Sequence, residues 1–157
     1  MGKIIIIMGS KQDLNHAKKI EDFLKIFEVE CVLRIASAHK TPLKVLEIIK
    51  EYEKDNVVFI TIAGRSNALS GFVDTNTSKP VIACPPYSEK FSGVDLFSSL
   101  RMPSGVSPMV VLEPENAALA SIKILAIKDE NLKKKIVEYQ NNKKEEIIQN
   151  DKELKNG

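Results

Sequence analysis

The chain has few of the side chains that most often mark a cofactor or metal site. Its 157 residues include no tryptophan, two cysteines and two histidines, and 6% of them are aromatic. The scarcity of aromatics and the lack of a ring-stacking loop disfavour a flavin site. Cys31 and Cys84 fall in apolar, strand-like runs, where small buried side chains are expected rather than a disulfide, a metal site or a nucleophile. We therefore expect no bound metal and a reducing compartment.

The chain also lacks a large net charge and a long apolar run. Lys and Arg number 23 against 21 Asp and Glu, and the net charge of +2 gives no electrostatic basis for binding nucleic acid or an anionic membrane. The N-terminal run Ile4 to Met8 is too short for a signal-peptide core or a membrane span. Ile6 occupies the position where a myristoylation signal has Ser or Thr. We expect a cytoplasmic protein that holds any anionic ligand locally.

Apolar runs and amphipathic stretches alternate along the chain. With 43% hydrophobic residues, its length suits one globular domain. The run Lys3 to Met8 is continuous rather than alternating, as in a parallel strand buried on both faces. Four more strands are predicted at residues 30–35, 57–62, 80–84 and 109–112, with helices between them. This order predicts an α/β fold, a three-layer parallel sheet of about five strands (flavodoxin-like or Rossmann-like) with a C-terminal helical extension.

The loops that follow the strands hold the candidate site, because ligands of such sheets bind beyond the carboxyl ends of the strands. The first loop contains Gly9, Ser10 and Asp13 at the start of a helix. Free backbone N–H groups and the helix dipole could hold a phosphate there, while Asp13 could accept from sugar hydroxyls. Alternatively, Ser10 or Asp13 only caps the helix. The lack of a GxGxxG motif and of a Walker lysine disfavours a dinucleotide or a nucleoside triphosphate.

The second and third loops add cations, hydroxyls and a histidine. Ser37 and Lys40 in one loop, and Arg65 and Ser66 in the other, suit a phosphate or a carboxylate. His39 lies beside the first pair, and an imidazole with a pKa near ~6.5 exchanges protons at neutral pH with little tuning. The residues alone therefore predict acid–base chemistry on a small phosphorylated molecule, without a metal or an organic cofactor.

Two local features complete this prediction. The second histidine, His16, lies in a stretch typical of a helix surface, so we leave it outside the site. Pro42 suits the first turn of the second helix, with Thr41 as its N-cap.

Five motifs, met in order along the chain, resemble the PurE family of purine biosynthesis. They are Ile7-Met8-Gly9-Ser10 with Asp13, Ser37-Ala38-His39-Lys40-Thr41-Pro42, Ala63-Gly64-Arg65-Ser66-Asn67, Cys84-Pro85-Pro86, and Ser98-Ser99-Leu100-Arg101-Met102-Pro103-Ser104-Gly105. The resemblance runs from residue 3 to 128, so we expect a catalytic domain at 1–128 and a helical extension at 129–157. It implies a homo-oligomer, a tetramer or octamer, with active sites between subunits.

The resemblance also favours one of the two classes in the family. The mutase class has Arg after the Ser-Ala-His triplet and a second histidine in a Gly-Ala-rich loop, whereas this chain has Lys40 and no histidine in residues 63–71. It is similar to the second class, which carboxylates 5-aminoimidazole ribonucleotide (AIR) directly with carbon dioxide to 4-carboxy-5-aminoimidazole ribonucleotide (CAIR), without a cofactor. N5-carboxyaminoimidazole ribonucleotide mutase is the alternative, and a non-catalytic nucleotide-binding module is a minor one.

The residues and the resemblance together imply roles in the site. His39 would move the proton, Ser10 and Asp13 would bind the phosphate and the ribose, and Lys40 would lie at the phosphate or the carboxylate. Arg65, Ser66 and the nearby backbone would hold the carbon dioxide end. The predicted substrate-binding residues are Gly9, Ser10, Asp13, Ser37, Ala38, Lys40, Gly64, Arg65, Ser66 and Asn67.

The C-terminal segment differs in composition from the rest. Residues 129–157 carry seven Lys and seven Asp or Glu around a thin apolar stripe of Leu132, Ile136, Tyr139, Ile147 and Ile148. Such a stripe stabilises a helix poorly unless it packs on something. We expect it to pack on a neighbouring subunit; the alternative is a solvated tail.

Overall fold

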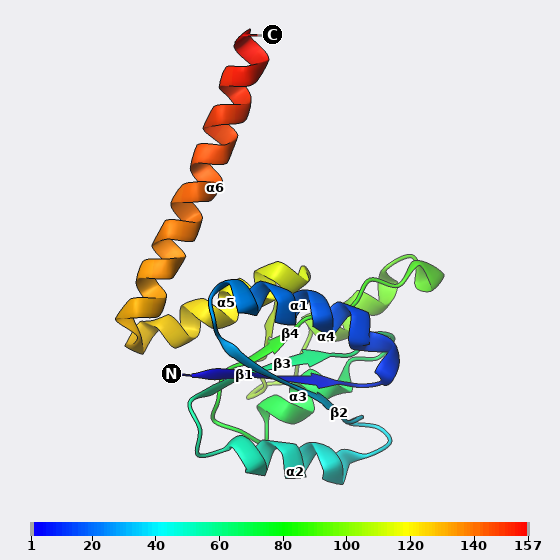
Figure 1. Ribbon diagram of the computed structural model, residues 1–157. Helices are drawn as coiled ribbons and strands as arrows, with labels where there is room; N and C mark the ends of the chain where they lie inside the picture. The colour runs from blue at the N-terminus through cyan, green and yellow to red at the C-terminus, as the bar shows by residue number, and fades with distance from the viewer. Residues whose placement is uncertain (1, 157) are drawn as a thin grey trace.

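The computed structural model describes residues 2–156 and has a five-stranded parallel sheet between helical layers (Figure 1). The strands are β1 (Lys3–Met8), β2 (Glu30–Ile35), β3 (Val57–Ile62), β4 (Val81–Ala83) and β5 (Met109–Val110), in the order β2-β1-β3-β4-β5. The predicted fold is confirmed. β4 is shorter than predicted because Pro80 and Pro85, which lack an N–H donor, flank it. β5 is shorter because the chain leaves the sheet toward Pro114.

Helices cover both faces of the sheet. α1 (Leu14–Ile26) and α5 (Pro114–Leu125) pack on one face, and α2 (Pro42–Tyr52) and α3 (Ala68–Asp74) pack on the other. Successive side chains of β1 point to opposite faces, so Ile4 and Ile6 join the first core while Ile5 and Ile7 join the second. Burying one such side chain contributes about 1.5–3 kcal/mol. β1 is therefore the centre of the fold, as its continuous apolar sequence predicts.

Residues 84–108 depart from the expected alternation of strand and helix. They form only short helical turns, namely η2 (Glu89–Phe91), η3 (Val94–Leu96) and α4 (Phe97–Leu100). Ser92 and Gly93 adopt left-handed φ values of 51° and 76°, which break any longer helix. Figure 1 shows this segment, in green, extending outward on the side of the sheet where the strands end. It exposes large apolar side chains: Tyr87, Phe91, Val94, Phe97 and Leu100.

The C-terminal helix α6 (Glu130–Asn156) follows the turn η4 (Ala126–Lys128). Its start packs on the body, with Leu132 and Ile136 buried and the Tyr139 ring lying edge-on to Phe23 and Phe27 at 5.5 and 5.4 Å between centroids. Residues 141–155 are exposed, and Figure 1 shows this part projecting away from the body. Among the described residues, no helix combines the length and apolar character needed to cross a membrane.

Candidate functional site

The first three loops meet at the carboxyl edge of the central strands. Gly9 N–H donates to the carbonyl of Ile62 at 2.8 Å, and Ala36 N–H donates to the carbonyl of Met8 at 2.9 Å. The chain order reverses here, since β1 lies between β2 and β3. The predicted residues are therefore presented at a topological switch point, where ligands of open α/β sheets bind.

The first loop is closed by a capping box. Ser10 Oγ accepts from Gln12 N–H at 3.2 Å, and Asp13 Oδ2 accepts from Ser10 N–H at 3.1 Å. These bonds begin the short helix η1 (Lys11–Asp13) that leads into α1. We expected free N–H groups in this loop, but those of Gly9, Ser10 and Gln12 are already bonded within the protein.

Asp13 combines this cap with an unfavourable environment for its charge. The carboxyl group is half-buried, and desolvation raises its pKa above the ordinary value, although the bonds from Ser10 oppose that shift. The N–H and the hydroxyl of Ser10 both donate to Oδ2 of this carboxylate. The capping alternative is thus confirmed as a structural role, and the binding of a sugar hydroxyl by this carboxylate stays a prediction.

The second loop is a compact local turn that leaves its functional side chains in solvent. Ser37 N–H donates to Thr41 Oγ1 at 2.9 Å, and Lys40 N–H donates to Ser37 Oγ at 3.2 Å. His39 and Lys40 are exposed. Pro42 begins α2 as predicted, whereas the Thr41 hydroxyl does not cap it, because that hydroxyl is bonded to Ser37.

The third loop is held by a different kind of contact. A Cβ added to Gly64 would lie 3.5 Å from Pro86 Cγ, so this loop rests on the Cys-Pro-Pro segment. Arg65 has a left-handed φ of 32°, and both Arg65 and Ser66 are exposed. Asn67 is only 4% exposed. It was predicted among the substrate-binding residues, but its groups are bonded inside the protein.

Those bonds form the Asn67 network, which consists of Asn67, Ser70, Ser98 and Ser99. Asn67 N–H donates to Ser98 Oγ at 2.9 Å, and Asn67 Nδ2 donates to Ser99 Oγ at 2.9 Å. Asn67 Oδ1 accepts from Ser70 N–H at 3.2 Å, which caps α3. Asn67 is therefore an anchor for the loop, and Arg65 and Ser66 are left exposed. Although Ser98 and Ser99 lie in one of the family motifs, the sequence alone did not predict that they bind Asn67.

His16 is placed differently from its expected position on a helix surface. Its ring is partly buried, with Nε2 3.3 Å from Cys84 Sγ, and Cys84 Sγ donates to the Leu112 carbonyl at 3.4 Å. Burial lowers the pKa of His16, and Lys19 lowers it further. Burial also raises the pKa of Cys84 to about 12, which keeps the thiol protonated. Sequence periodicity did not show that α5 and the β4 loop cover this face of α1.

The geometry of the described residues supports neither a reactive cysteine nor a metal site. Cys84 is fully buried, Cys31 is partly buried with its pKa raised by burial to about 12, and neither forms a disulfide. No group of three or more His, Cys, Asp or Glu side chains within residues 2–156 is arranged to hold a metal ion.

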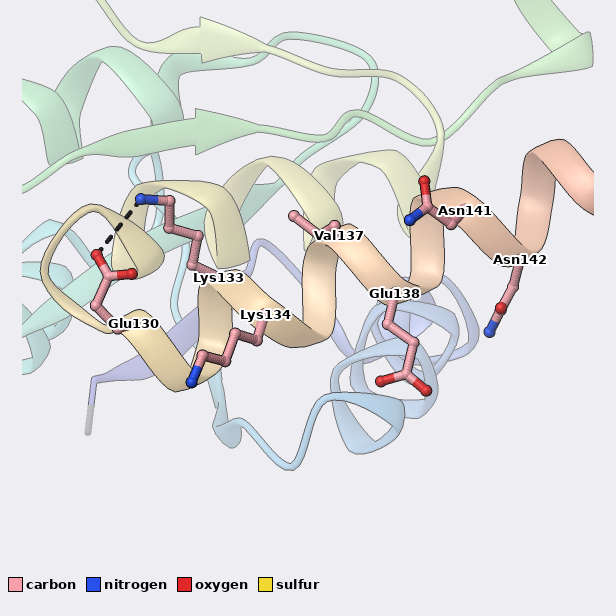
Figure 2. Close-up of a pocket in the computed structure, with 7 residues that line it drawn as sticks. All are labelled: Glu130, Lys133, Lys134, Val137, Glu138, Asn141 and Asn142. Carbon is pink, nitrogen blue, oxygen red and sulfur yellow. Dashed lines mark hydrogen bonds and ion pairs between the residues drawn. The ribbon is translucent and has the colours of Figure 1, made fainter.

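The third loop borders a hollow of the single chain, whereas no hollow among the described residues was found at the first two. Among five hollows on the surface of the described residues, none is lined by Ser10, Ser37 or His39, but Arg65 lines one of about 510 Å³ together with Phe91, Val94, Asp95 and Ser98. A hollow of about 510 Å³ is lined only by α6, and Figure 2 shows its side chains along that one helix. It is a helix surface rather than an enclosed site. A cleft of about 370 Å³ lies beside His16, Pro86 and Glu113.

The family model described as AIR carboxylase matches residues 3–146. The chain belongs to the AIR carboxylase (PurE) family. It is thus an enzyme of purine biosynthesis, and the family match extends into α6, past residue 128 where the motifs seen in the sequence end.

Individual relatives cover almost all of the chain. Phosphoribosylaminoimidazole carboxylase of Archaeoglobus fulgidus is 67% identical over 153 residues, which are 98% of this chain and 85% of that protein. The crystal structure of Treponema denticola PurE is 48% identical with a TM-score of 0.96 and covers 99% of both chains. N5-carboxyaminoimidazole ribonucleotide mutase of Methanocaldococcus jannaschii is 46% identical over 155 residues, 97% of each chain. The names of these relatives therefore include both the carboxylase and the mutase.

Proposed function

We propose that this enzyme carboxylates AIR directly with carbon dioxide to form CAIR. The observation that carries the proposal is that Lys40 beside His39 and Arg65 in the third loop are exposed cations, whereas the mutase class has Arg after the Ser-Ala-His triplet and a second histidine in a Gly-Ala-rich loop. The name of the 67% identical A. fulgidus relative supports the same reaction. The mutase is the second candidate, because the M. jannaschii relative carries that name.

For this reaction the protein must position AIR and carbon dioxide and transfer one proton. Carbon 4 of AIR is the nucleophilic carbon of an enamine, and it attacks the carbon of carbon dioxide to form a carbon–carbon bond and a carboxylate. The ring then loses the proton on carbon 4 to recover aromaticity. His39 accepts this proton, since it is the histidine exposed at the edge where the loops meet. Arg65 and Ser66 face the new carboxylate, and their positive charge and hydroxyl stabilise it.

The remaining predicted residues hold the ribonucleotide. Asp13 is the acceptor for the ribose hydroxyls, because its half-buried carboxylate has an unfavourable environment that a hydroxyl donor relieves. Ser10 and Lys40 hold the phosphate, in keeping with a hydroxyl and an ammonium that lie on adjacent loops. Ser37 and Ala38 form the turn that presents His39.

We also propose that the site is completed by other copies of the chain. Two features support assembly: His39 and Lys40 are exposed in the single chain, and residues 87–100 expose a row of large apolar side chains, of which Phe91 and Val94 line a hollow with Arg65. Residues 141–155 of α6 are exposed in the single chain. In the helical extension expected at residues 129–157, the start, with Leu132 and Ile136, packs on its own chain rather than on a neighbour, and we propose that its exposed part, residues 141–155, packs on a neighbouring subunit.

Light scattering tests the assembly. The full chain should be a homo-oligomer, a tetramer or an octamer, and a variant that ends at Gln140 keeps the contacts of Leu132, Ile136 and Tyr139 while losing the projecting part of α6. A smaller assembly from this variant is the expected result. An unchanged size would show that the projecting helix is a solvated tail.

The reaction itself is tested by product absorbance. The purified enzyme is given AIR in bicarbonate-rich buffer and in carbon-dioxide-depleted buffer, and N5-carboxyaminoimidazole ribonucleotide in the depleted buffer. We expect turnover only of AIR with bicarbonate present. Turnover of the N5-carboxy compound in depleted buffer would make the enzyme a mutase.

A further inference from the structure

One side of α3 is joined to the segment 98–107 at three points. Asn67 bonds to Ser98 and Ser99 at the start of the helix. A Cβ added to Gly71 would lie 3.1 Å from Met102 Sδ, and Asp74 Oδ2 accepts from Ser107 N–H at 2.7 Å. The positions 67, 71 and 74 are spaced by four and three residues, so they lie on one helix face.

The first of these contact points lies next to the loop that carries Arg65. Only Ser66 separates Arg65 from Asn67, and Ala68 N–H donates to the Ser66 carbonyl at 3.0 Å. Arg65 has a φ of 32°, a region that non-glycine residues populate rarely. Such a conformation persists where the surrounding structure fixes it. The fixed neighbours here are Gly64 against Pro86 and the buried Asn67.

The hydroxyl groups of Ser98 and Ser99, both on α4, hold Asn67 in place. Ser98 Oγ accepts from Asn67 N–H and donates to the Asp95 carbonyl at 2.8 Å, so both of its functions are used. Ser99 is 1% exposed, and its Oγ accepts from the buried Asn67 amide. A segment about thirty residues away in sequence thereby determines where the backbone of residues 64–66 lies.

We propose that Ser98 and Ser99 are positioning residues that hold Arg65 and Ser66 in the geometry that faces the reacting carboxylate. They act through Asn67: Ser99 is buried, and Ser98, which lines a hollow beside Arg65, has its hydroxyl bonded to Asn67 N–H and to the Asp95 carbonyl. This inference rests on the proposed function of the third loop. It explains why the Ser-Ser-Leu-Arg segment accompanies the Ala-Gly-Arg-Ser-Asn loop in one chain.

The test compares both ends of the α3 contact. Ser98→Ala and Ser99→Ala each remove an acceptor for Asn67, and Ser98→Thr keeps the hydroxyl at a partly exposed position that tolerates either change. Asp74→Ala is the matched control, because it removes one hydrogen bond of the same contact about 10 Å farther along the helix. Each variant is measured for melting temperature, kcat, KM and hydrogen exchange of residues 63–68.

Loss of positioning should affect turnover rather than ribonucleotide binding. We expect Ser98→Ala and Ser99→Ala to lower kcat by about 10- to 100-fold, with KM for the ribonucleotide within about twofold of wild type. Ser98→Thr should restore kcat, and Asp74→Ala should lower the melting temperature while leaving kcat unchanged. Exchange of residues 63–68 should increase in the two serine-to-alanine variants only.

Two results would overturn the inference: serine variants that lose stability but keep wild-type kcat, or an unchanged exchange of residues 63–68. Kinetics use whichever of the two substrates the wild type turns over. If the wild type turns over neither, the proposed function fails, while the exchange measurement still decides whether the serines hold the loop.

Discussion

The second and third loops present similar side chains at the same sheet edge, but they are held in opposite ways. The second loop, residues 37–41, is closed by bonds between residues three or four apart, Ser37 with Lys40 and Thr41. The third loop, residues 64–67, is held by Ser98 and Ser99, which lie 31 and 32 residues farther along the chain. The difference separates a locally folded turn, which carries the proposed base His39, from an externally anchored loop, which carries the proposed carboxylate-binding Arg65.

The two kinds of support have different functional consequences. The local turn carries the exposed His39 and Lys40 and is restricted only by short-range bonds. The third loop has Arg65 in a left-handed conformation next to the buried Asn67, and bonds to a distant segment hold it. In the proposed reaction, charge develops at the new carboxylate, which is the end assigned to the externally anchored loop.

The largest expected effect comes from removing the base in the second loop. His39→Asn keeps a polar side chain at an exposed position but cannot transfer the proton, so we expect kcat to fall by roughly 10²–10⁴. KM for the ribonucleotide should stay close to wild type. Steady-state kinetics measure both, and wild-type turnover in this variant would remove His39 from the mechanism.

The next effect separates function from strain in the third loop. Arg65→Gly removes the charge but suits a φ of 32°, so kcat/KM should fall about 10- to 100-fold, as for a lost charge-assisted hydrogen bond. Its melting temperature should not fall. Ser92→Gly, at a φ of 51°, is the matched control, with unchanged kinetics. A large loss of stability in Arg65→Gly would instead assign Arg65 a structural role.

Stability measurements sharpen the contrast between the two kinds of support. Asn67→Ala removes a buried amide and leaves Ser99 Oγ without its donor, which should lower the free energy of unfolding by about 1–3 kcal/mol. Ser37→Ala removes one acceptor from an exposed turn and should cost about 0.5–1.5 kcal/mol at most. Urea unfolding at one protein concentration compares them. Equal losses would contradict the distinction between the loops.

The smallest effect concerns His16, which supports the third loop through Cys84 and the Pro86 segment. Its pKa is lower in the folded protein than its ordinary value of 6.5, so the unfolded chain binds more protons between these two values. Its stabilising contribution is present above pH ~6.5 and is lost as the pH falls through the folded pKa. His16→Gln does not titrate.

Urea unfolding of the wild type and of His16→Gln at pH 7.5 and pH 5.5 checks the direction of this pH dependence. The wild type should lose more stability on acidification than His16→Gln. A larger loss in the variant would contradict the assignment of a neutral His16 against Cys84.

Sequence patterns predicted the strands and loops that depend on local or periodic signals. The bounds of β1, β2 and β3 agree with the predicted ranges, which rest on mostly apolar runs, and the loops after them follow from the parallel order. The Asn67 network and the burial of His16 depend on segments that meet only after folding, and no spacing in the chain encodes those contacts. The capping box was recognised only as an alternative, because Ser and Asp before a helix suit both a cap and a ligand.

The central claim, direct use of carbon dioxide, is tested most directly by the origin of the new carboxylate. Wild-type enzyme is given AIR, unlabelled N5-carboxyaminoimidazole ribonucleotide and ¹³C-bicarbonate together, and the label in CAIR is measured by mass spectrometry at early times. The account predicts that the carboxylate of CAIR carries ¹³C from the first turnovers. Unlabelled CAIR would mean that the carboxylate came from the N5-carboxy compound, which would contradict the account and identify a mutase.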